Sequence, residues 1–186
     1  SILAEAERNL GKLANLGTFP ARLDWLVQPF IRREAVVSTR IEGTRASRSD
    51  VYVYEAQQLS FLEPDSDAYE VYNYVKALDY GLKHLQSLPI SLRLIRELHT
   101  RLMENVSGEH LTPGEFRRSQ NWIGPIGCTL QNAPYVPPPV QEMLAILNQL
   151  EIFMHAPGEL PDLTRFMLIH YQFEAIHPFL DGNGRI

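Results

Sequence analysis

The chain has 186 residues, of which 45% are apolar and 21% are charged, and its formal net charge at pH 7 is −5. Such a length and usage are typical of one globular domain with a sizeable core. The negative charge gives no basic surface for nucleic acid, and no apolar run approaches the ~18 residues that span a bilayer. The single Cys128 cannot form an internal disulfide, which favours a reducing compartment and predicts a cytoplasmic protein without a membrane partner.

Apolar spacing in the N-terminal part predicts helices that glycine and proline separate. An amphipathic helix is expected over residues 3–16. Residues 23–28 predict a short second helix, and Pro29, which suits a first helical turn, should begin a third helix that ends near Ile41. A helix over about 50–62 is also expected, although the valines and tyrosines at its start would equally suit a strand.

Two helices with clear apolar faces are predicted next. One should run from Ser66 to about Gln86, and the other, capped by Ser91, should end near Met103. The first should bury a stripe formed by Tyr69, Tyr72, Val75, Leu78 and Leu82. The second should turn inward Leu94, Ile95, Leu98 and Leu102. His99 on this second helix is expected to be structural.

Residues 104–139 are rich in glycine and proline, so no long helix is expected there. Within them, residues 122–124 and 133–136 could pair as a short β-hairpin across a turn. The alternative is an ordinary surface loop in which the basic pair Arg117 and Arg118 is solvated.

Two further helices are expected over residues 140–154 and 163–176, the second capped by Asp162. The first presents on one face Met143, Leu147, Leu150 and Met154. The second carries a continuous stripe made of Leu163, Phe166, Met167, His170 and Phe173. This stripe predicts a central helix that delivers His177 at its C-terminal end.

The residues after this last helix read His-Pro-Phe-Leu-Asp-Gly-Asn-Gly-Arg and combine several chemistries. His177 could accept a proton from an attacking hydroxyl, because an imidazole titrates near neutral pH. Asp181 could hold a hard cation such as magnesium beside a phosphate. Gly182 and Gly184 let backbone N–H groups point into a shared concavity, and Arg185 offers a planar fork for phosphate oxygens. Together these are the parts of a site for nucleotide phosphate transfer.

This stretch resembles the core motif of the Fic-domain family, which typically moves AMP from ATP to a side-chain hydroxyl of a protein. The resemblance implies that His177 is the general base, that Asp181 holds Mg²⁺ and that Phe179 is a core anchor. ATP would be the substrate that supplies AMP. The nucleotide-binding residues, which include the anion hole, would be Gly182, Asn183, Gly184 and Arg185.

Ser38 and Glu42 share one face of the predicted helix that ends before Gly43. Alone, this pattern fits a solvated helix terminus. Beside the core motif it is similar to the inhibitory-helix motif of family members that carry their own inhibitor. There the glutamate reaches a second arginine of the core motif and blocks placement of the ATP γ-phosphate. The resemblance therefore implies an inhibitory role for Ser38 and Glu42.

Residues 114–124 are similar to the segment that leads into the family's flap, a hairpin edge that holds the target in extended form over the active site. Main-chain pairing at such an edge positions a peptide with little demand on its sequence. The residues implied to position the target are Ile123, Gly124 and Pro125.

The resemblance predicts a mostly α-helical Fic fold, a helical bundle with a small β-hairpin flap. An N-terminal region with the inhibitory helix would cover residues 1–65, and the domain core would cover residues 66–186. The chain stops at Ile186, before the second arginine of the family motif, so the helices that follow in the family are expected to be missing. The sequence leaves a homodimer open.

The expected function is a self-inhibited protein adenylyltransferase that modifies a Ser, Thr or Tyr hydroxyl of another protein or of itself. Removal of AMP, with Glu42 orienting a water, is one alternative, and transfer of another phosphate-containing group is a second. The Gly-Asn-Gly spacing resembles the AMP-transferring members rather than the toxin kinases of the wider family. A third interpretation is a catalytically silent fragment that binds nucleotide or acts as an interaction module.

Overall fold

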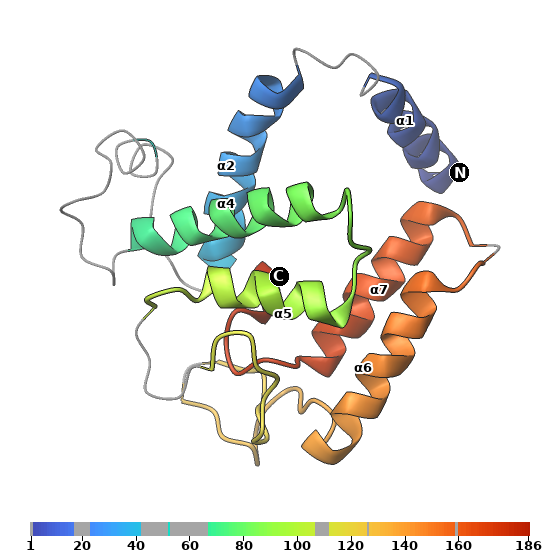
Figure 1. The fold of residues 1–186 in the computed structure, drawn as a ribbon. Helices are drawn as coiled ribbons and strands as arrows, with labels where there is room; N and C mark the ends of the chain where they lie inside the picture. Colours follow the sequence, from blue (N-terminus) through green and yellow to red (C-terminus); the bar gives the residue numbers. More distant parts are fainter. Residues whose placement is uncertain are drawn as a thin grey trace.

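A computed structural model describes residues 2–16, 23–41, 52, 67–106, 112–125, 127–158 and 160–186. Its helices are α1 (Ile2–Leu16), α2 (Leu23–Ile41), α4 (Asp67–His84), α5 (Leu92–Leu102), α6 (Val140–His155) and α7 (Asp162–Ile176), followed by the 3-10 turn η1 (Asn183–Arg185) (Figure 1). The predicted mostly α-helical class is therefore confirmed. The helix expected over 50–62 lies outside the described residues, apart from Tyr52.

The helix α4 packs against both α2 and α5 in the middle of the fold (Figure 1). Its contact with α2 buries Val71 and Val75 in a cluster with Ile31, Ala35 and Val36. Its contact with α5 buries Ala77 with Leu102 and Met103. A helix with two packed neighbours needs two apolar faces, so the single predicted stripe is only partly right. Val75 of that stripe is buried, whereas Leu82 is 48% exposed.

A second core lies between α5, α6 and α7, where α6 and α7 run side by side (Figure 1). Its buried members are Ile95, Met143, Leu147, Leu150, Phe173, Ile176 and Phe179. The inward faces predicted for α5 and α6 are thus confirmed at these positions. Phe179 is fully buried, as expected of an anchor, and it fixes the loop after α7 against the body of the fold.

The helix α2 is continuous through Pro29, which corrects the prediction of two helices separated at this residue. Proline removes one backbone hydrogen bond and crowds the carbonyl four residues earlier, which usually breaks or kinks a helix. Pro29 lies on the exposed side of α2, where water can satisfy the released carbonyl. The packing of the following turns against α4 then supplies the burial that keeps the helix in place.

The helix α7 is buried only in its last turns, so its predicted central position is wrong for the N-terminal part. Phe166 and Met167 are 55% and 63% exposed, because α6 covers a single side of the helix. Asp162 is the first residue of α7 and gives no side-chain cap. The exposed N–H of Leu163 is instead satisfied by Glu7 Oε1 of α1, at 3.1 Å.

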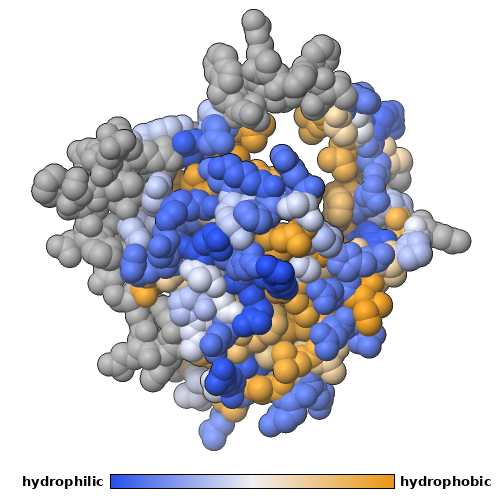
Figure 2. Space-filling view, viewed as in Figure 1, coloured by the Kyte–Doolittle hydropathy of each residue, from blue (hydrophilic) through white to orange (hydrophobic). Residues whose placement is uncertain are grey.

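An apolar groove of about 460 Å³ continues from the exposed part of α7 toward α4 and α5. Its lining includes Leu82, Leu94, Leu98, Phe166, Ile169 and Ile186. Hydrophobic patches also interrupt the hydrophilic surface on the side that carries α6 and α7 (Figure 2). Neither His177 nor Asp181 lines this groove. None of the helices in the described ranges combines the length and hydropathy that crossing a membrane requires.

Candidate active site

His177 occupies the C-cap of α7 in a left-handed conformation, with φ 48° and ψ 62°. Its backbone N–H donates to the Phe173 carbonyl at 3.0 Å, which closes the last helical turn. Pro178 has no N–H and cannot continue the helix. A non-glycine residue in this conformation costs about 1–2 kcal/mol, so neighbouring contacts must hold it.

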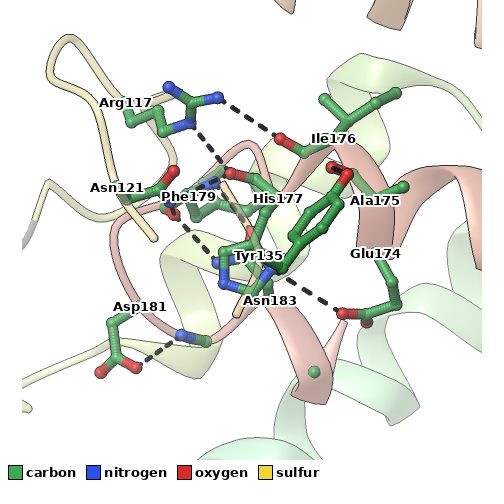
Figure 3. Close-up of polar contacts among 12 residues, drawn as sticks. Arg117, Asn121, Tyr135, Glu174, Ala175, Ile176, His177, Phe179, Asp181 and Asn183 are labelled. Atoms are coloured by element: carbon green, nitrogen blue, oxygen red, sulfur yellow. Dashed lines mark hydrogen bonds and ion pairs between the residues drawn. The ribbon is translucent and has the colours of Figure 1, made fainter. Parts of the chain in front are cut away.

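Two side chains from the segment before α6 supply these contacts (Figure 3). Arg117 Nε donates to the His177 carbonyl at 3.0 Å, and Asn121 Nδ2 donates to the same carbonyl at 3.2 Å. Arg117 also donates to the Ile176 carbonyl at 3.4 Å, and Asn121 to the Phe179 carbonyl at 3.0 Å. Carbonyls at a helix C-terminus lack partners within the helix and favour a nearby positive charge. Both side chains thus stabilise the turn that positions His177.

Burial lowers the pKa of the His177 imidazole, and the charge of Arg117 acts in the same direction. The Glu174 carbonyl and the Asp181 carboxylate offset part of this effect on the pKa. Nδ1 lies 3.9 Å from Glu174 Oε2, and it makes no hydrogen bond of normal geometry among the described residues. The imidazole is therefore neutral near pH 7, the form that accepts a proton.

Asn183 holds the loop after His177 in a closed turn. Its Oδ1 accepts from the Phe179 N–H at 2.8 Å, and its Nδ2 donates to the Phe179 carbonyl at 2.9 Å. The side chain lies inside the loop, and the residue is only 1% exposed. The predicted contact of Asn183 with a nucleotide would therefore use its backbone, because its amide is occupied.

His99 on α5 fastens the same loop to the body of the fold. Its Nδ1 accepts from the Gly114 N–H at 2.8 Å, so its Nε2 carries the proton that it donates to the Asp181 carbonyl at 3.0 Å. The ring stacks on Phe179, with centroids 3.7 Å apart and an angle of 3° between the planes. Burial lowers the pKa of His99, which favours this neutral form. These contacts confirm the structural role predicted for His99.

Asp181 lies at the exposed edge of the loop, and Gly182 is buried next to it. Gly182 has φ 75°, and a Cβ there would lie 3.0 Å from Met103 Sδ, so the position requires glycine. Its N–H donates to Asp181 Oδ1 at 2.8 Å. The Asp181 side chain is 47% exposed, and its Oδ2 lies 3.6 Å from a terminal nitrogen of Arg185. Asp181 thus presents a carboxylate to solvent beside the glycine turn.

Within the described loop at 177–185, Asp181 is the carboxylate that could hold a metal. In the part of the chain that the structure describes, no three His, Cys, Asp or Glu side chains converge on a common point. Magnesium usually takes one or two carboxylates and completes its shell with water and substrate phosphates. Asp181 fits a magnesium ion that arrives with a nucleotide rather than a permanently bound metal.

Arg185 points into the protein, although the sequence predicts that it binds phosphate. Its side chain is 2% exposed and pairs with Glu70 of α4, with 2.7 Å between a terminal nitrogen and Oε2. Breaking such a buried pair leaves an uncompensated charge, which is costly. This ion pair ties the loop to α4, and the exposed Gly184 lies just before it on η1.

The helix α2 reaches the loop from another side. Ser38 Oγ donates to the Gly184 carbonyl at 3.5 Å, across 146 positions of sequence. Ser38 is 7% exposed, and the contact itself is partly buried because Gly184 is exposed. Glu42 comes directly after the end of α2 and lies outside the described residues.

The predicted hairpin is reduced to one antiparallel bridge in the described part of the chain. The Ile123 N–H donates to the Tyr135 carbonyl at 2.9 Å, and the reverse bond measures 3.3 Å. Ile123 and Tyr135 lie in the two segments, 122–124 and 133–136, that the sequence predicts to pair. Tyr135 also connects the hairpin to α7, because its hydroxyl donates to the Ala175 carbonyl at 2.7 Å (Figure 3).

Gly124 and Pro125 begin the turn of this hairpin. A Cβ on Gly124 would lie 2.7 Å from Pro134 Cδ in the other arm and 2.6 Å from Cys128 Sγ in the turn, so glycine lets the two arms approach. The Pro125 carbonyl accepts from the Cys128 N–H at 3.0 Å. Ile123 is 39% exposed and therefore offers an edge side chain to solvent.

Sequence reasoning missed Arg117, Asn121, Glu174 and Glu70 as residues of this site. Arg117 and Arg118 look equivalent in the sequence, yet Arg117 is 1% exposed and the Arg118 side chain is 83% exposed. The partner of Arg117 at His177 lies 60 residues away, and Glu70 lies 115 residues from Arg185. No local pattern reports contacts across such separations.

The fold and the loop define a helical domain that presents a largely buried histidine beside a glycine-rich turn. Residues 1–83 match the family described as "Fic/DOC family N-terminal", and residues 89–186 match the "Fic/DOC family". The chain belongs to the Fic/DOC family, so the resemblance seen in the core motif is confirmed.

Curated relatives carry the name "Protein adenylyltransferase Fic". The protein of Drosophila grimshawi is 30% identical over 141 residues, which cover 70% of this chain and 27% of that protein. The protein of Drosophila willistoni is also 30% identical over 141 residues, with 70% of this chain and 26% of that protein covered. The chain thus spans about a quarter of the length of these relatives.

Solved structures of Fic proteins share the fold. A Fic domain containing signaling protein from Bacteroides thetaiotaomicron has a TM-score of 0.72 at 22% identity, covering 88% of this chain and 61% of that chain. A Fic family protein from Desulfovibrio desulfuricans has a TM-score of 0.67 at 21% identity, and the match covers 99% of this chain and 53% of that chain. Fic-1 from C. elegans has a TM-score of 0.65 at 20% identity, and the match covers 99% of this chain and 54% of that chain.

Proposed function

We propose that this chain carries the catalytic core of a protein adenylyltransferase, which moves AMP from ATP to a Ser, Thr or Tyr hydroxyl of a protein. The observation that carries the proposal is a neutral, largely buried imidazole at the end of α7, next to a turn that internal hydrogen bonds already shape. The name of the curated relatives supports the same activity.

In this reaction the target hydroxyl oxygen forms a bond to the α-phosphorus of ATP. The bond from that phosphorus to the oxygen bridging to the β-phosphate breaks, and pyrophosphate leaves. His177 takes the hydroxyl proton, which its lowered pKa permits near pH 7. Backbone donors of the turn formed by Gly182, Asn183 and Gly184 would stabilise the phosphate charge, where much of the catalysis of such transfers lies.

Asp181 would hold Mg²⁺ together with the ATP phosphates. The ion would supply positive charge against the phosphate oxygens. The exposure of this carboxylate and its place at the edge of the turn support that role. Arg185 would contribute its charge from beneath the turn, while Glu70 holds its guanidinium in place.

The proposal includes self-inhibition by Glu42. The contact of Ser38 with the Gly184 carbonyl supports it, because it brings the last turns of α2 next to the turn at 182–184. A carboxylate near that position would compete with the phosphate charge of ATP. Its partner would be the second arginine of the family motif, in a protein that includes it.

The proposal is tested by intact mass spectrometry of the protein that contains this chain, after incubation with ATP and Mg²⁺. A mass increase of one AMP on the protein itself or on an added target is the expected result, and chelation of the magnesium should prevent it. Nucleotide binding in calorimetry without any transfer would contradict the proposal and favour a nucleotide-binding module.

A further inference from the structure

A single side chain, Arg117, bonds to the base of the hairpin and to the end of α7 at the same time. Figure 3 shows its bonds to the end of α7. On the hairpin side its terminal nitrogens donate to the Ser119 carbonyl at 3.3 Å and to the Pro138 carbonyl. Ser119 precedes the arm that carries Ile123, and Pro138 follows the arm that carries Tyr135. The guanidinium therefore closes the base of the hairpin from within.

On the helix side, Arg117 contacts the carbonyls of three consecutive residues. Its side chain donates to Ile176 and His177, and its own backbone N–H donates to the Pro178 carbonyl at 2.8 Å. These carbonyls have no helical partners, since α7 ends there and Pro178 has no N–H to offer. Arg117 thus supplies the donors that the turn at His177 lacks.

Arginine is the side chain whose chemistry suits this junction. A planar guanidinium has five N–H donors in a fixed fork, whereas a lysine has a compact head with three. The residue is 1% exposed, and the surrounding carbonyl dipoles face its charge in place of water. Four carbonyls from three separate stretches, at Ser119, at Pro138 and at 176–177, therefore accept from one guanidinium.

We propose that Arg117 is the positioning residue that sets the place of the hairpin relative to His177. The inference rests on the proposed function, in which the hairpin holds the target and His177 takes the proton of its hydroxyl. Other side chains, Asn183 and His99, hold the turn at 182–184. Loss of Arg117 should therefore disturb the alignment of target and base more than the binding of ATP.

The main test replaces Arg117 by lysine, which keeps the charge and loses the fork. In Arg117→Lys the kcat of AMP transfer should fall at least ~10-fold while the KM for ATP stays within about twofold, because the lost contact acts on alignment. Arg118→Lys is the matched control, since its exposed side chain pairs only with Glu115 among the described contacts and should change neither value.

A second variant, Arg117→Gln, removes the charge and should raise the pKa of His177 in NMR titrations, since the charge of Arg117 now lowers it. The groups that face His177 are Glu174, Arg117 and Asp181. Amide hydrogen exchange should also quicken in both variants at Ile123 and Tyr135, on the hairpin, and at His177, on the other side of the junction. Added guanidinium ion should partly restore transfer in Arg117→Ala and not in His177→Ala.

These measurements separate the two proposals. Hydrogen exchange and the His177 titration do not depend on transfer, so they test the junction even in a protein that transfers no AMP. A folded Arg117→Lys variant with wild-type kcat and wild-type exchange at the hairpin overturns the inference. Loss of the whole fold in all three Arg117 variants overturns it as well, because Arg117 would then support the domain in general.

Discussion

The loop at 177–185 and the hairpin whose arms are 122–124 and 133–136 are held in different ways. In the loop, Asn183 and Arg185 are buried and their side chains bond to the loop itself or to α4. In the hairpin, one backbone bridge joins the two arms, Arg117 closes the base, the Tyr135 hydroxyl bonds to α7, and apolar side chains stay in solvent. Those exposed at about 40% are Trp122, Ile123, Tyr135 and Val136.

The difference matches the two tasks that the proposed function sets. Phosphate chemistry needs donors and a base in fixed positions before the substrate arrives, because electrostatic stabilisation depends on preorganisation. Recognition of a protein target needs an accessible edge with unsatisfied backbone groups and apolar surface. Four substitutions and one pH titration test this contrast, and the largest effect is expected at His177.

His177→Ala should lower AMP transfer by about 10²–10⁴-fold, the usual contribution of a general base. ATP affinity should stay within a few-fold, since a base acts in the transition state more than in ground-state binding. Transfer rates and calorimetry measure the two quantities. His155→Ala, at the exposed end of α6, is the control, and wild-type transfer by His177→Ala would remove this residue from the mechanism.

Glu42→Gly should raise self-modification at least tenfold, a change of ~1.4 kcal/mol, in the longer protein that includes the second motif arginine. The reason is that a carboxylate no longer competes with the ATP phosphates for that arginine. AMP incorporation measured by intact mass gives the result. In the double variant Glu42→Gly with His177→Ala, AMP incorporation should return to background. Equal incorporation in wild type and Glu42→Gly would contradict the inhibitory role of Glu42.

The rise of the transfer rate with pH should occur at a lower pH than the unperturbed pKa of histidine would give. Burial lowers the pKa of His177, so the rate should rise as the pH passes a value below ~6.5 and then level off before neutrality. The folded chain also binds fewer protons at His177 than the unfolded chain. The contribution of neutral, largely buried His177 to the stability of the fold is therefore fully present above pH ~6.5, the unperturbed pKa of histidine. It is lost as the pH falls through the lowered pKa of His177 in the folded chain. A kcat/KM profile with its acid limb above 6.5 would contradict the burial argument.

Asn183→Ala should destabilise the fold by about 1–3 kcal/mol, because it leaves a buried N–H of Phe179 without its acceptor. Asn132→Ala is the matched variant in the hairpin, where the exposed amide accepts from the Thr129 N–H at 2.6 Å. It should cost less than about 0.5 kcal/mol, as exposed positions do. Urea unfolding of both variants compares the two regions, and equal losses would show that the loop is no more tightly held than the hairpin.

Tyr135→Phe should have the smallest effect, about 1 kcal/mol or less, because it removes one hydrogen bond to the Ala175 carbonyl. That bond links the hairpin to α7, so the loss should appear in the KM for the protein target and not in ATP affinity. Tyr171→Phe, with a hydroxyl on a side chain that is 71% exposed, is the control. An unchanged KM for the target would show that Arg117 alone holds the hairpin in register.

Local sequence patterns predicted the helices of the described residues, apart from the continuity of α2 through Pro29, and they predicted the residues of the loop. Helical periodicity and Ser91 located α5 to within a residue at each end, and the cap is observed, since Ser91 accepts from the Leu94 N–H. The run from His177 to Arg185 identified the family without any structure, as it fixes both side chains and glycine positions over a short span. Helix caps and short motifs involve residues close together in the sequence, so the sequence alone is enough to recognise them.

Only the tertiary structure decided which faces are buried and which charges are paired. Phe166 and Met167 have a helical apolar pattern, but a helix buries only the side that another element covers, and α6 covers one side of α7. Arg117 looks like a solvated cation in the sequence and Arg185 looks like a phosphate ligand, yet both are buried because distant segments supply their partners. The cost of burying a charge depends on those partners, and their positions depend on how the whole chain packs.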